Sequence, residues 1–313
     1  MAEWSPEQVV DEPLARRLIG SQFPQLAGAA IERLGEGWDN TVWLVDGRWS
    51  FRFPRREVVV PGLEREIAVL PLLAPRLPAP IPVPELVGRP ADGYPFPFAG
   101  ASYLPGDEPF QVCPGDAERI ALAEPIARFL RALHAIDPGA HPITADLPLD
   151  RNRRADMPYR VEFTRRRFDE LSELGLWEAP ASVRELVESA AGLGAPAPPR
   201  IVHGDLHLRH VLIDGGRLSG VIDWIDVGLA DPAVDLALYW GFVPPAGRPA
   251  FRDAYGEIGS DQLLRARVLA IFLWSTIAIY ARREGIPALE LDAMSGLERA
   301  VTDQAPAPTP RPS

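Results

Sequence analysis

Three of the chain's five histidines lie in one short run, His203-Gly204-Asp205-Leu206-His207-Leu208-Arg209-His210. A further acidic residue follows in Val221-Ile222-Asp223-Trp224. We expect the first run to be a loop between strands, and the residues between the two motifs to form a hairpin that returns Asp223 to the same end. Two carboxylates brought together in this way suit phosphoryl transfer. One accepts the proton of an attacking hydroxyl, and the other holds the metal ion that neutralises the phosphates.

Other interpretations of this cluster remain open. Asp205 can cap a turn and Asp223 can end a strand without taking part in a reaction. Alternatively, Asp205, Asp223 and the three histidines can be read as the two-metal cluster of a metal-dependent phosphoesterase. That chemistry normally recruits further histidine ligands from later loops, and no histidine follows His210. Phosphoryl transfer is therefore the preferred interpretation.

The segment from His203 to His207, followed by Ile222-Asp223-Trp224, resembles the catalytic loop and metal motif of the aminoglycoside phosphotransferase family. The later run Ala230-Asp231-Pro232-Ala233-Val234-Asp235-Leu236 is similar to the start of the helix that follows this motif in the family. The members are kinases of antibiotics and small metabolites. The resemblance covers nearly the whole chain and implies an α+β, two-lobed protein-kinase-like fold, with a small β-rich N-terminal lobe and a larger, mostly helical C-terminal lobe.

The resemblance assigns roles to the clustered residues. Asp205 would be the catalytic base or hydroxyl-positioning carboxylate, and His203 would brace the loop by hydrogen bonding. Asp223 would bind the Mg²⁺ that bridges the nucleotide phosphates. His210 stands where the family usually has an asparagine metal ligand, and its nitrogen suits Mg²⁺ less well than an oxygen does. However, the segment from His210 to Asp214 is similar to the macrolide 2′-phosphotransferases, a branch of the same family; the role of His207 stays open.

The chain contains no lysine, so all 32 of its basic residues are arginines. This composition excludes a Schiff base, a pyridoxal phosphate linkage and a Walker-A lysine. In the kinase pattern, a lysine on the third strand grips the nucleotide phosphates and pairs with a helix glutamate. Here Arg52 takes that place, with Glu66 as its natural partner, and a guanidinium also binds phosphate well. Alternatively, Arg52 is simply an outward-facing strand residue.

The resemblance also implies how a nucleotide would be held. The turn containing Gly35 and Gly37 would let backbone amides approach the phosphates, although a plain hairpin entry explains it equally well. The hinge, which includes Ser102 and Tyr103, would read the base through backbone groups. ATP and GTP are both compatible with this arrangement.

Hydrophobic periodicity predicts the elements that position these residues. Asp46-Gly47 is a strong hairpin signal between two strands, and a helix is expected after Pro61. Residues 1–104 are therefore expected to form the nucleotide-binding lobe ending in the hinge. Residues 105–303 are expected to form the helical lobe with the catalytic loop and acceptor site, with helices near 122–133, 159–174, 182–191, 232–240, 262–283 and 289–301. The proline-rich residues 304–313 are expected to be a disordered tail.

Composition limits the class of protein. The formal net charge of −11 argues against a nucleic-acid partner. The most apolar stretch, Val268 to Tyr280, is too short to span a bilayer, and the chain opens without a signal-peptide pattern. We expect a cytoplasmic protein with no membrane partner, and the sequence leaves its oligomeric state undetermined.

The sequence thus predicts an enzyme that uses Mg²⁺ to move the γ-phosphate of ATP or GTP to a hydroxyl of a small molecule, an antibiotic of the macrolide or aminoglycoside type. A catalytically weak nucleotide-binding protein is a further alternative. The negative charge favours a cationic aminoglycoside, whereas the Arg52 and His210 variants favour a macrolide. So do the C-terminal aromatic residues, unless they belong to the core: Tyr239, Trp240, Phe242, Phe272, Trp274 and Tyr280.

Overall fold

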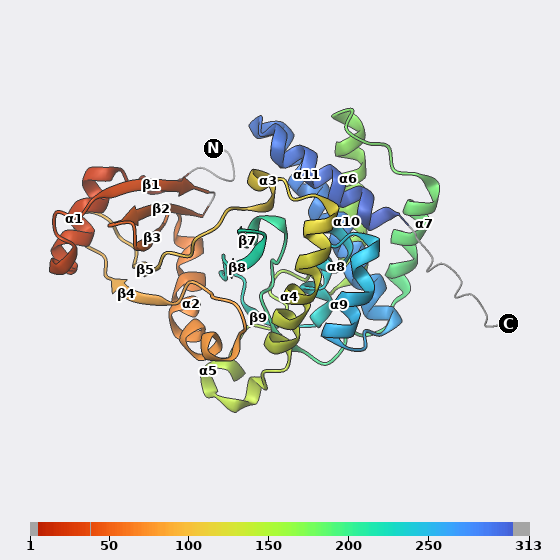
Figure 1. The fold of residues 1–313 in the computed structure, drawn as a ribbon, viewed down its shortest axis with the longest axis horizontal. Coiled ribbons are helices and arrows are strands. Elements are labelled where there is room, and N and C mark those ends of the chain that lie inside the picture. The colour runs from red at the N-terminus through yellow and green to blue at the C-terminus, as the bar shows by residue number, and fades with distance from the viewer. Residues whose placement is uncertain (1–5, 38, 303–313) are drawn as a thin grey trace.

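The computed structural model describes residues 6–37 and 39–302, and the predicted tail at 304–313 lies outside the described residues. An antiparallel sheet forms one side of the molecule and a group of helices forms the other (Figure 1). The sheet has the order β1-β2-β3-β5-β4. Its strands are β1 (Ile31–Glu36), β2 (Asn40–Val45), β3 (Trp49–Pro54), β4 (Pro84–Gly88) and β5 (Phe98–Ser102).

The hairpin between β2 and β3 follows from its turn residues. Asp46 and Gly47 both have positive φ, 55° and 62°, as a tight two-residue hairpin turn requires. Strand alternation then buries Phe51 and Phe53, whose rings pack with that of Phe98 on β5. Arg52, between the two phenylalanines, points to the opposite face of the sheet. Helix α1 (Glu12–Gln22), which the sequence analysis did not predict, contributes to the same core as these rings.

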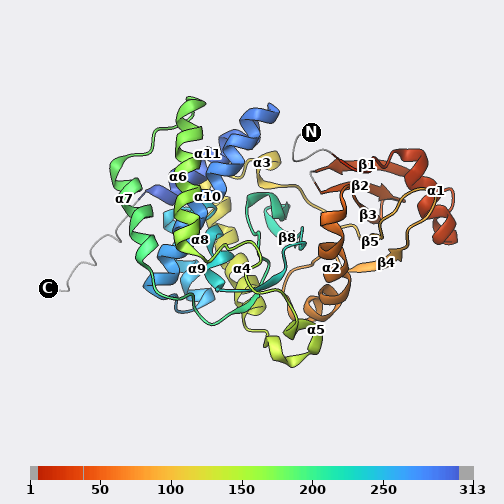
Figure 2. The same ribbon diagram turned by 180° about the vertical axis from the view of Figure 1, so that it is seen from behind.

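Helix α2 (Val60–Leu73) lies between the sheet and the rest of the molecule (Figures 1 and 2). Gly62 allows a close approach, because a Cβ at this position would lie 2.2 Å from Cγ1 of Ile225. One turn further on, Arg65 donates a hydrogen bond from Nη1 to the Ile225 carbonyl at 2.7 Å. The helix therefore ties the sheet to the segment that follows Asp223.

The remaining chain is mostly helical and surrounds two short β ribbons, β6–β9 and β7–β8. The strands are β6 (Arg200–Val202), β7 (Val211–Asp214), β8 (Arg217–Val221) and β9 (Gly228–Ala230). The helices are α3 (Pro109–Val112), α4 (Asp116–His134), α5 (Pro142–Ala145), α6 (Met157–Glu173), α7 (Ala181–Ser189), α8 (Ala237–Gly241), α9 (Arg248–Tyr255), α10 (Ser260–Glu284) and α11 (Pro287–Val301). This arrangement confirms the predicted α+β, two-lobed fold. We propose to divide the lobes after residue 104, between β5 and α3.

Two predicted helices differ in detail. The helix expected at 232–240 is a 3₁₀ turn, Pro232–Val234, followed by the short α8. Helix α7, expected at 182–191, spans Ala181–Ser189 and has Pro180 at its N-cap. In both places proline sets the local geometry, because it cannot donate a backbone hydrogen bond and fixes φ near the helical value.

Helix α10 is the one candidate membrane span among the described residues by length and composition. However, 78% of its most apolar window is buried inside the protein. It packs against α6, α8 and α11. The helix is thus the central core element of the C-terminal lobe.

Candidate active site

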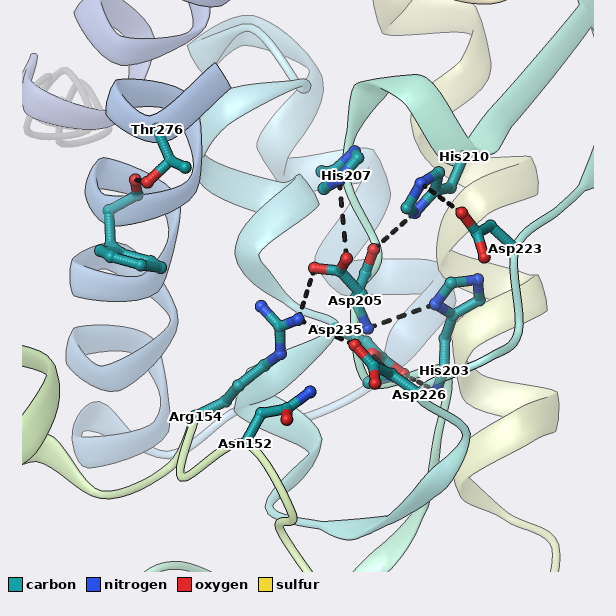
Figure 3. Close-up of polar contacts among 12 residues, drawn as sticks. Asn152, Arg154, His203, Asp205, His207, His210, Asp223, Asp226, Asp235 and Thr276 are labelled. Carbon is teal, nitrogen blue, oxygen red and sulfur yellow. Dashed lines mark hydrogen bonds and ion pairs between the residues drawn. The ribbon is translucent and has the colours of Figure 1, made fainter. Parts of the chain in front are cut away.

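The histidine-rich run forms the loop between β6 and β7, and the β7–β8 hairpin returns Asp223 beside it (Figure 3). Two backbone positions make this close approach possible. Gly204 has a φ of 90°, and a Cβ there would lie 2.2 Å from the carbonyl oxygen of Asp226. Asp223 itself has a φ of 64°, which is uncommon for a residue with a side chain. The structure thus brings Asp205, His210 and Asp223 together.

His203 connects the loop to the hairpin. Its Nε2 donates a hydrogen bond to the Ile222 carbonyl at 2.9 Å, and its Nδ1 accepts one from the backbone N–H of Asp205 at 3.3 Å. Burial lowers the pKa of His203, which keeps the ring neutral, as these two bonds require. The side chain therefore fixes the backbone on both sides of the site and faces no open space of its own.

Asp235 supports the same loop from the segment before α8. Its carboxylate accepts the backbone N–H of His203 at 2.8 Å and of Gly204 at 3.0 Å, and it lies 3.1 Å from Nε2 of His134 on α4. Burial alone would raise the pKa of Asp235. However, the contact with His134 and the nearby His203 hold this pKa below its usual value. The loop is thus anchored by a buried, charged carboxylate.

Asp205 is bound by an arginine from a distant part of the chain. Nη2 of Arg154 lies 2.8 Å from Asp205 Oδ1 and 3.1 Å from Asp226 Oδ2. The other carboxylate oxygen of Asp205 lies 3.8 Å from Nε2 of His207. Burial lowers the pKa of His207 well below its usual value, so this ring is neutral. One oxygen of Asp205 is therefore fixed by a cation, and the other faces a neutral group.

His210 links the two predicted carboxylates. Its Nδ1 donates to the Asp205 carbonyl at 2.7 Å, and its Nε2 lies 3.3 Å from Asp223 Oδ2. Burial would raise the pKa of Asp223, but the charges of His210 and Arg52 hold it well below its usual value. The Asp223 side chain remains 42% exposed, so a charged carboxylate is open to solvent. Such a group can hold a divalent cation, and the imidazole can be a second donor once Nε2 has lost its proton.

Arg52 and Glu66 form the predicted ion pair between β3 and α2. The Glu66 side chain is 1% exposed, and that of Arg52 is 15% exposed. Burial disfavours the charged guanidinium, yet Glu66 and Asp223 together raise the pKa of Arg52. A permanent cation therefore lies within electrostatic range of Asp223.

The other predicted nucleotide residues lie along the sheet. Gly35 is in β1 opposite Val42, and the N–H of Gly37 donates to the Asn40 carbonyl at 2.9 Å in the β1–β2 turn. Asp39 in this turn is within electrostatic range of Asp223, so the turn approaches the Asp223 side of the site. Ser102 and Tyr103 lie at the end of β5. The N–H of Tyr103 donates to the Arg48 carbonyl at 2.7 Å, so this group is already paired within the protein.

Sequence reasoning missed Arg154 and Asp226 as members of the site. Arg154 stands in the run Arg151-Asn152-Arg153-Arg154, which resembles an ordinary charged loop, and Asp226 follows three residues after a stronger candidate. Asp235 was part of a noted motif but received no role. The available signal for Arg154 was the density of arginines just before a helix, which is a weak one.

The predicted aromatic residues differ in burial. Trp240 is partly buried against the core, and its Nε1 donates to the Leu263 carbonyl at 2.9 Å. Tyr239, Phe242 and Trp274 are buried in the core. Phe272 and Tyr280 are only partly buried, and they lie on the same face of α10. The three buried residues are structural, and Phe272 and Tyr280 pack against the same core while remaining partly exposed.

Comparison with known proteins agrees with the fold and the motifs. Residues 30–269 match the family model of the phosphotransferase enzyme family. The uncharacterized protein YcbJ of Bacillus subtilis (strain 168) is 31% identical over 208 residues, which cover 61% of this chain and 62% of that protein. An aminoglycoside 3′-phosphotransferase of Streptomyces fradiae is 31% identical over 183 residues, which cover 56% of this chain and 64% of that protein. The chain thus matches less than two thirds of the length of either relative.

Solved structures resemble the chain over a greater length. The GDP and kanamycin complex of the aminoglycoside phosphotransferase APH(2″)-IIIa has a TM-score of 0.66 and 25% identity, covering 90% of this chain and 96% of that one. A macrolide 2′-phosphotransferase type I has a TM-score of 0.63 and 24% identity, covering 94% and 98%; this second likeness concerns the fold alone. The resemblance noted in the sequence is confirmed, and the chain belongs to the phosphotransferase enzyme family.

Proposed function

We propose that this protein transfers the γ-phosphate of ATP or GTP to a hydroxyl group of a small molecule, an antibiotic of the macrolide or aminoglycoside type. One observation carries the proposal. The His210 ring bonds the backbone of Asp205 and contacts the carboxylate of Asp223, so a candidate base and a candidate metal ligand are fixed beside each other. This is the pairing that phosphoryl transfer requires.

In this proposal, Asp205 accepts the proton of the acceptor hydroxyl. Its Oδ1 is held by Arg154, so Oδ2 is the oxygen that receives the acceptor. The hydroxyl oxygen attacks the γ-phosphorus in line, a new O–P bond forms, and the bond to the β-phosphate oxygen breaks. The products are a phosphate monoester and a nucleoside diphosphate, with no covalent enzyme intermediate. His203 contributes by fixing the loop backbone rather than by exchanging protons.

Asp223 and His210 are the residues that would hold Mg²⁺. The fit is supported by the charged, partly exposed carboxylate of Asp223, and it is weakened by the nitrogen donor of His210. When bound, the ion neutralises the charge of the nucleotide phosphates.

We assign the nucleotide to the cleft beside β3. Arg52, held by Glu66, would bind its phosphates, with Gly35 and Gly37 in the turn above them. The segment at Ser102 and Tyr103 would contact the base. Solved complexes of structural relatives support a nucleotide co-substrate, because one contains GDP and kanamycin and another contains streptomycin and ATP. We also propose that the protein acts in the cytoplasm.

The test is phosphate transfer from [γ-³²P]ATP and GTP to erythromycin, kanamycin and viomycin. We expect Asp205→Asn to lower kcat by roughly 10²–10⁴-fold, because it removes the proton acceptor. Asp214→Asn is the matched control, since this carboxylate is exposed at the end of β7. Normal transfer by the Asp205→Asn protein would refute the assignment.

A phosphoesterase is the second candidate. It is favoured by one observation: Asp205, His207 and His210 each offer a metal-ligand atom within 4.8 Å of the others. Hydrolysis of p-nitrophenyl phosphate with Mn²⁺ or Zn²⁺, in the absence of nucleotide, would favour this candidate. Transfer that depends on a nucleotide would exclude it.

A further inference from the structure

Helix α10 carries a half-buried stripe on an otherwise buried surface. From Arg265 to Ala281 its residues are buried except at Phe272, Thr276 and Tyr280, which follow one another at intervals of one helical turn. Thr276 lies on the far side of Asp205 and Arg154 from Asp223 (Figure 3). The ring of Tyr280, at one end of the stripe, lies 5.7 Å from the Arg209 guanidinium, so the stripe reaches the catalytic loop.

Helix α6 extends this surface. The rings of Tyr159 and Phe163 lie 4.5 Å apart between centroids. The guanidinium of Arg160 lies 5.2 Å from the ring of Tyr159 and 4.9 Å from that of Phe272, so it joins the two helices. We call the surface formed by Tyr159, Phe163, Phe272, Thr276 and Tyr280 the aromatic wall.

Arginines already occupy the rings of the aromatic wall. Arg153 lies 4.1 Å from the ring of Tyr159, Arg166 lies 4.9 Å from that of Phe163, and Arg209 of the catalytic loop lies 5.7 Å from that of Tyr280. Burial lowers the pKa of Arg160 to about 10, which still leaves it charged at neutral pH. A substrate ammonium group would therefore meet cations where it would otherwise find aromatic faces.

Several carboxylates near the wall are also paired with arginines. Asp156 lies 2.6 Å from Arg153, and Glu108 lies 3.2 Å from Arg209. Glu162 is paired with Arg166 in the same way. Asp205 and Asp226 share Arg154, as described above. A substrate with several ammonium groups would be repelled by these arginines, whereas a neutral apolar surface beside them would meet no like charge.

We infer that the acceptor is an alcohol with a broad apolar face and at most one cationic group, and that polyamine sugars are disfavoured. This inference rests on the proposed function and narrows its acceptor to one of the two types. The aromatic wall selects the acceptor molecule through its apolar rings and through the fixed positive charges of its arginines. The net charge of the whole chain has less influence, because charges that lie close to the ligand dominate over distant ones that salt screens.

Binding measurements test this inference directly. Isothermal titration of the wild-type protein with erythromycin, which has a single amine, and with kanamycin, which has several, gives the two dissociation constants. We expect erythromycin to bind at least about tenfold more tightly, a difference of about 1.4 kcal/mol. Thr276→Glu places a carboxylate in the middle of the stripe, and Thr276→Gln is its matched neutral control. Only the glutamate variant should shift the preference toward kanamycin, by about tenfold.

Each outcome bears on the inference. Kanamycin binding as tightly as erythromycin would overturn it, and so would binding of neither compound or an equal shift in both Thr276 variants. The proposed function is judged separately by phosphate transfer. Transfer to any alcohol that depends on Asp205 would preserve that function even if the inference fails. Selective binding of erythromycin without such transfer would support the selective role of the aromatic wall and would refute the proposed phosphate transfer.

Discussion

At the scale of single residues, one guanidinium controls the geometry of the proposed base. Arg154 binds Asp205 and Asp226 through the same nitrogen, Nη2, so the two carboxylates are held on one side of the cleft. Their charges raise the pKa of Arg154 against the effect of burial, and the cation is therefore permanent. Arg154 is a positioning residue, because it holds Oδ1 of Asp205 and leaves Oδ2 without a contact to the guanidinium.

We predict that Arg154→Gln lowers kcat by about 10–100-fold, because a misplaced carboxylate is an inefficient proton acceptor. The KM for the nucleotide should change little, and Arg154→Lys should restore part of the activity. Steady-state kinetics check this, with the exposed Arg151→Gln as the control. An unchanged kcat in Arg154→Gln, with the protein folded, would show that Asp205 is positioned by other groups.

The members of the site differ in how far the sequence could predict them. Asp205, His210 and Asp223 were predictable because a short loop and a hairpin confine them to one place. Arg154 was not, because it reaches the loop from a segment about 50 residues earlier through folding of the whole lobe. A local sequence pattern shows which residues are neighbours along the chain. It does not show which distant arginine will compensate the charge of a carboxylate such as Asp205.

At the scale of elements, the catalytic loop depends on a junction between α4, the β6–β7 loop and the turn before α8. Asp235 is 0% exposed and satisfies two backbone N–H groups of the loop. It also bonds His134, which in turn lies 2.8 Å from the Tyr255 hydroxyl. Buried networks of this kind fix one conformation, because each unpaired member would be costly.

We predict that Asp235→Asn lowers the free energy of unfolding by about 2–4 kcal/mol at pH 7. The pKa of Asp235 is lower in the folded than in the unfolded state, so its carboxylate stabilises the fold fully above about pH 4 and progressively less as the pH falls. The difference between wild type and variant should therefore shrink in acid. Urea unfolding at pH 7 and below pH 4 measures it, and a difference that grows in acid would contradict this account.

The elements themselves were largely predictable where the hydrophobic pattern is strong. The β2–β3 hairpin and the helices α4, α6, α10 and α11 follow from turn residues and periodicity. Helices α1 and α9 were not predicted, and neither was β4, which begins at the end of a proline-rich stretch. In β4 the pairing with β5 supplies the hydrogen bonds that the local sequence does not suggest.

At the scale of the whole molecule, the proposed nucleotide site lies where the two lobes meet. Helix α2 belongs to the first lobe, yet Gly62 and Arg65 contact Ile225 in the second. The Arg52–Glu66 pair lies just beside this contact. A ligand bound here would touch both lobes and stabilise the complete fold rather than one half.

We predict that a nucleotide with Mg²⁺ raises the melting temperature. At a concentration 100 times its Kd, a ligand that binds only the native state stabilises it by about 2.7 kcal/mol, which corresponds to a shift of a few degrees. Differential scanning fluorimetry with ATP and GTP measures the shift and identifies the preferred donor. Asp223→Asn should remove the part that depends on Mg²⁺. No shift with either nucleotide would contradict the assignment of the cleft.

The arginine at position 52 also decides which reagents can detect this site. Acyl-phosphate nucleotides and succinimidyl esters label kinases by acylating a lysine near the phosphates, and this chain has no lysine side chain to acylate. A guanidinium that keeps its proton is not nucleophilic under the same conditions. Surveys of kinases that rely on lysine labelling would therefore miss this protein, and dicarbonyl reagents directed at arginine are the appropriate probes of its phosphate contacts.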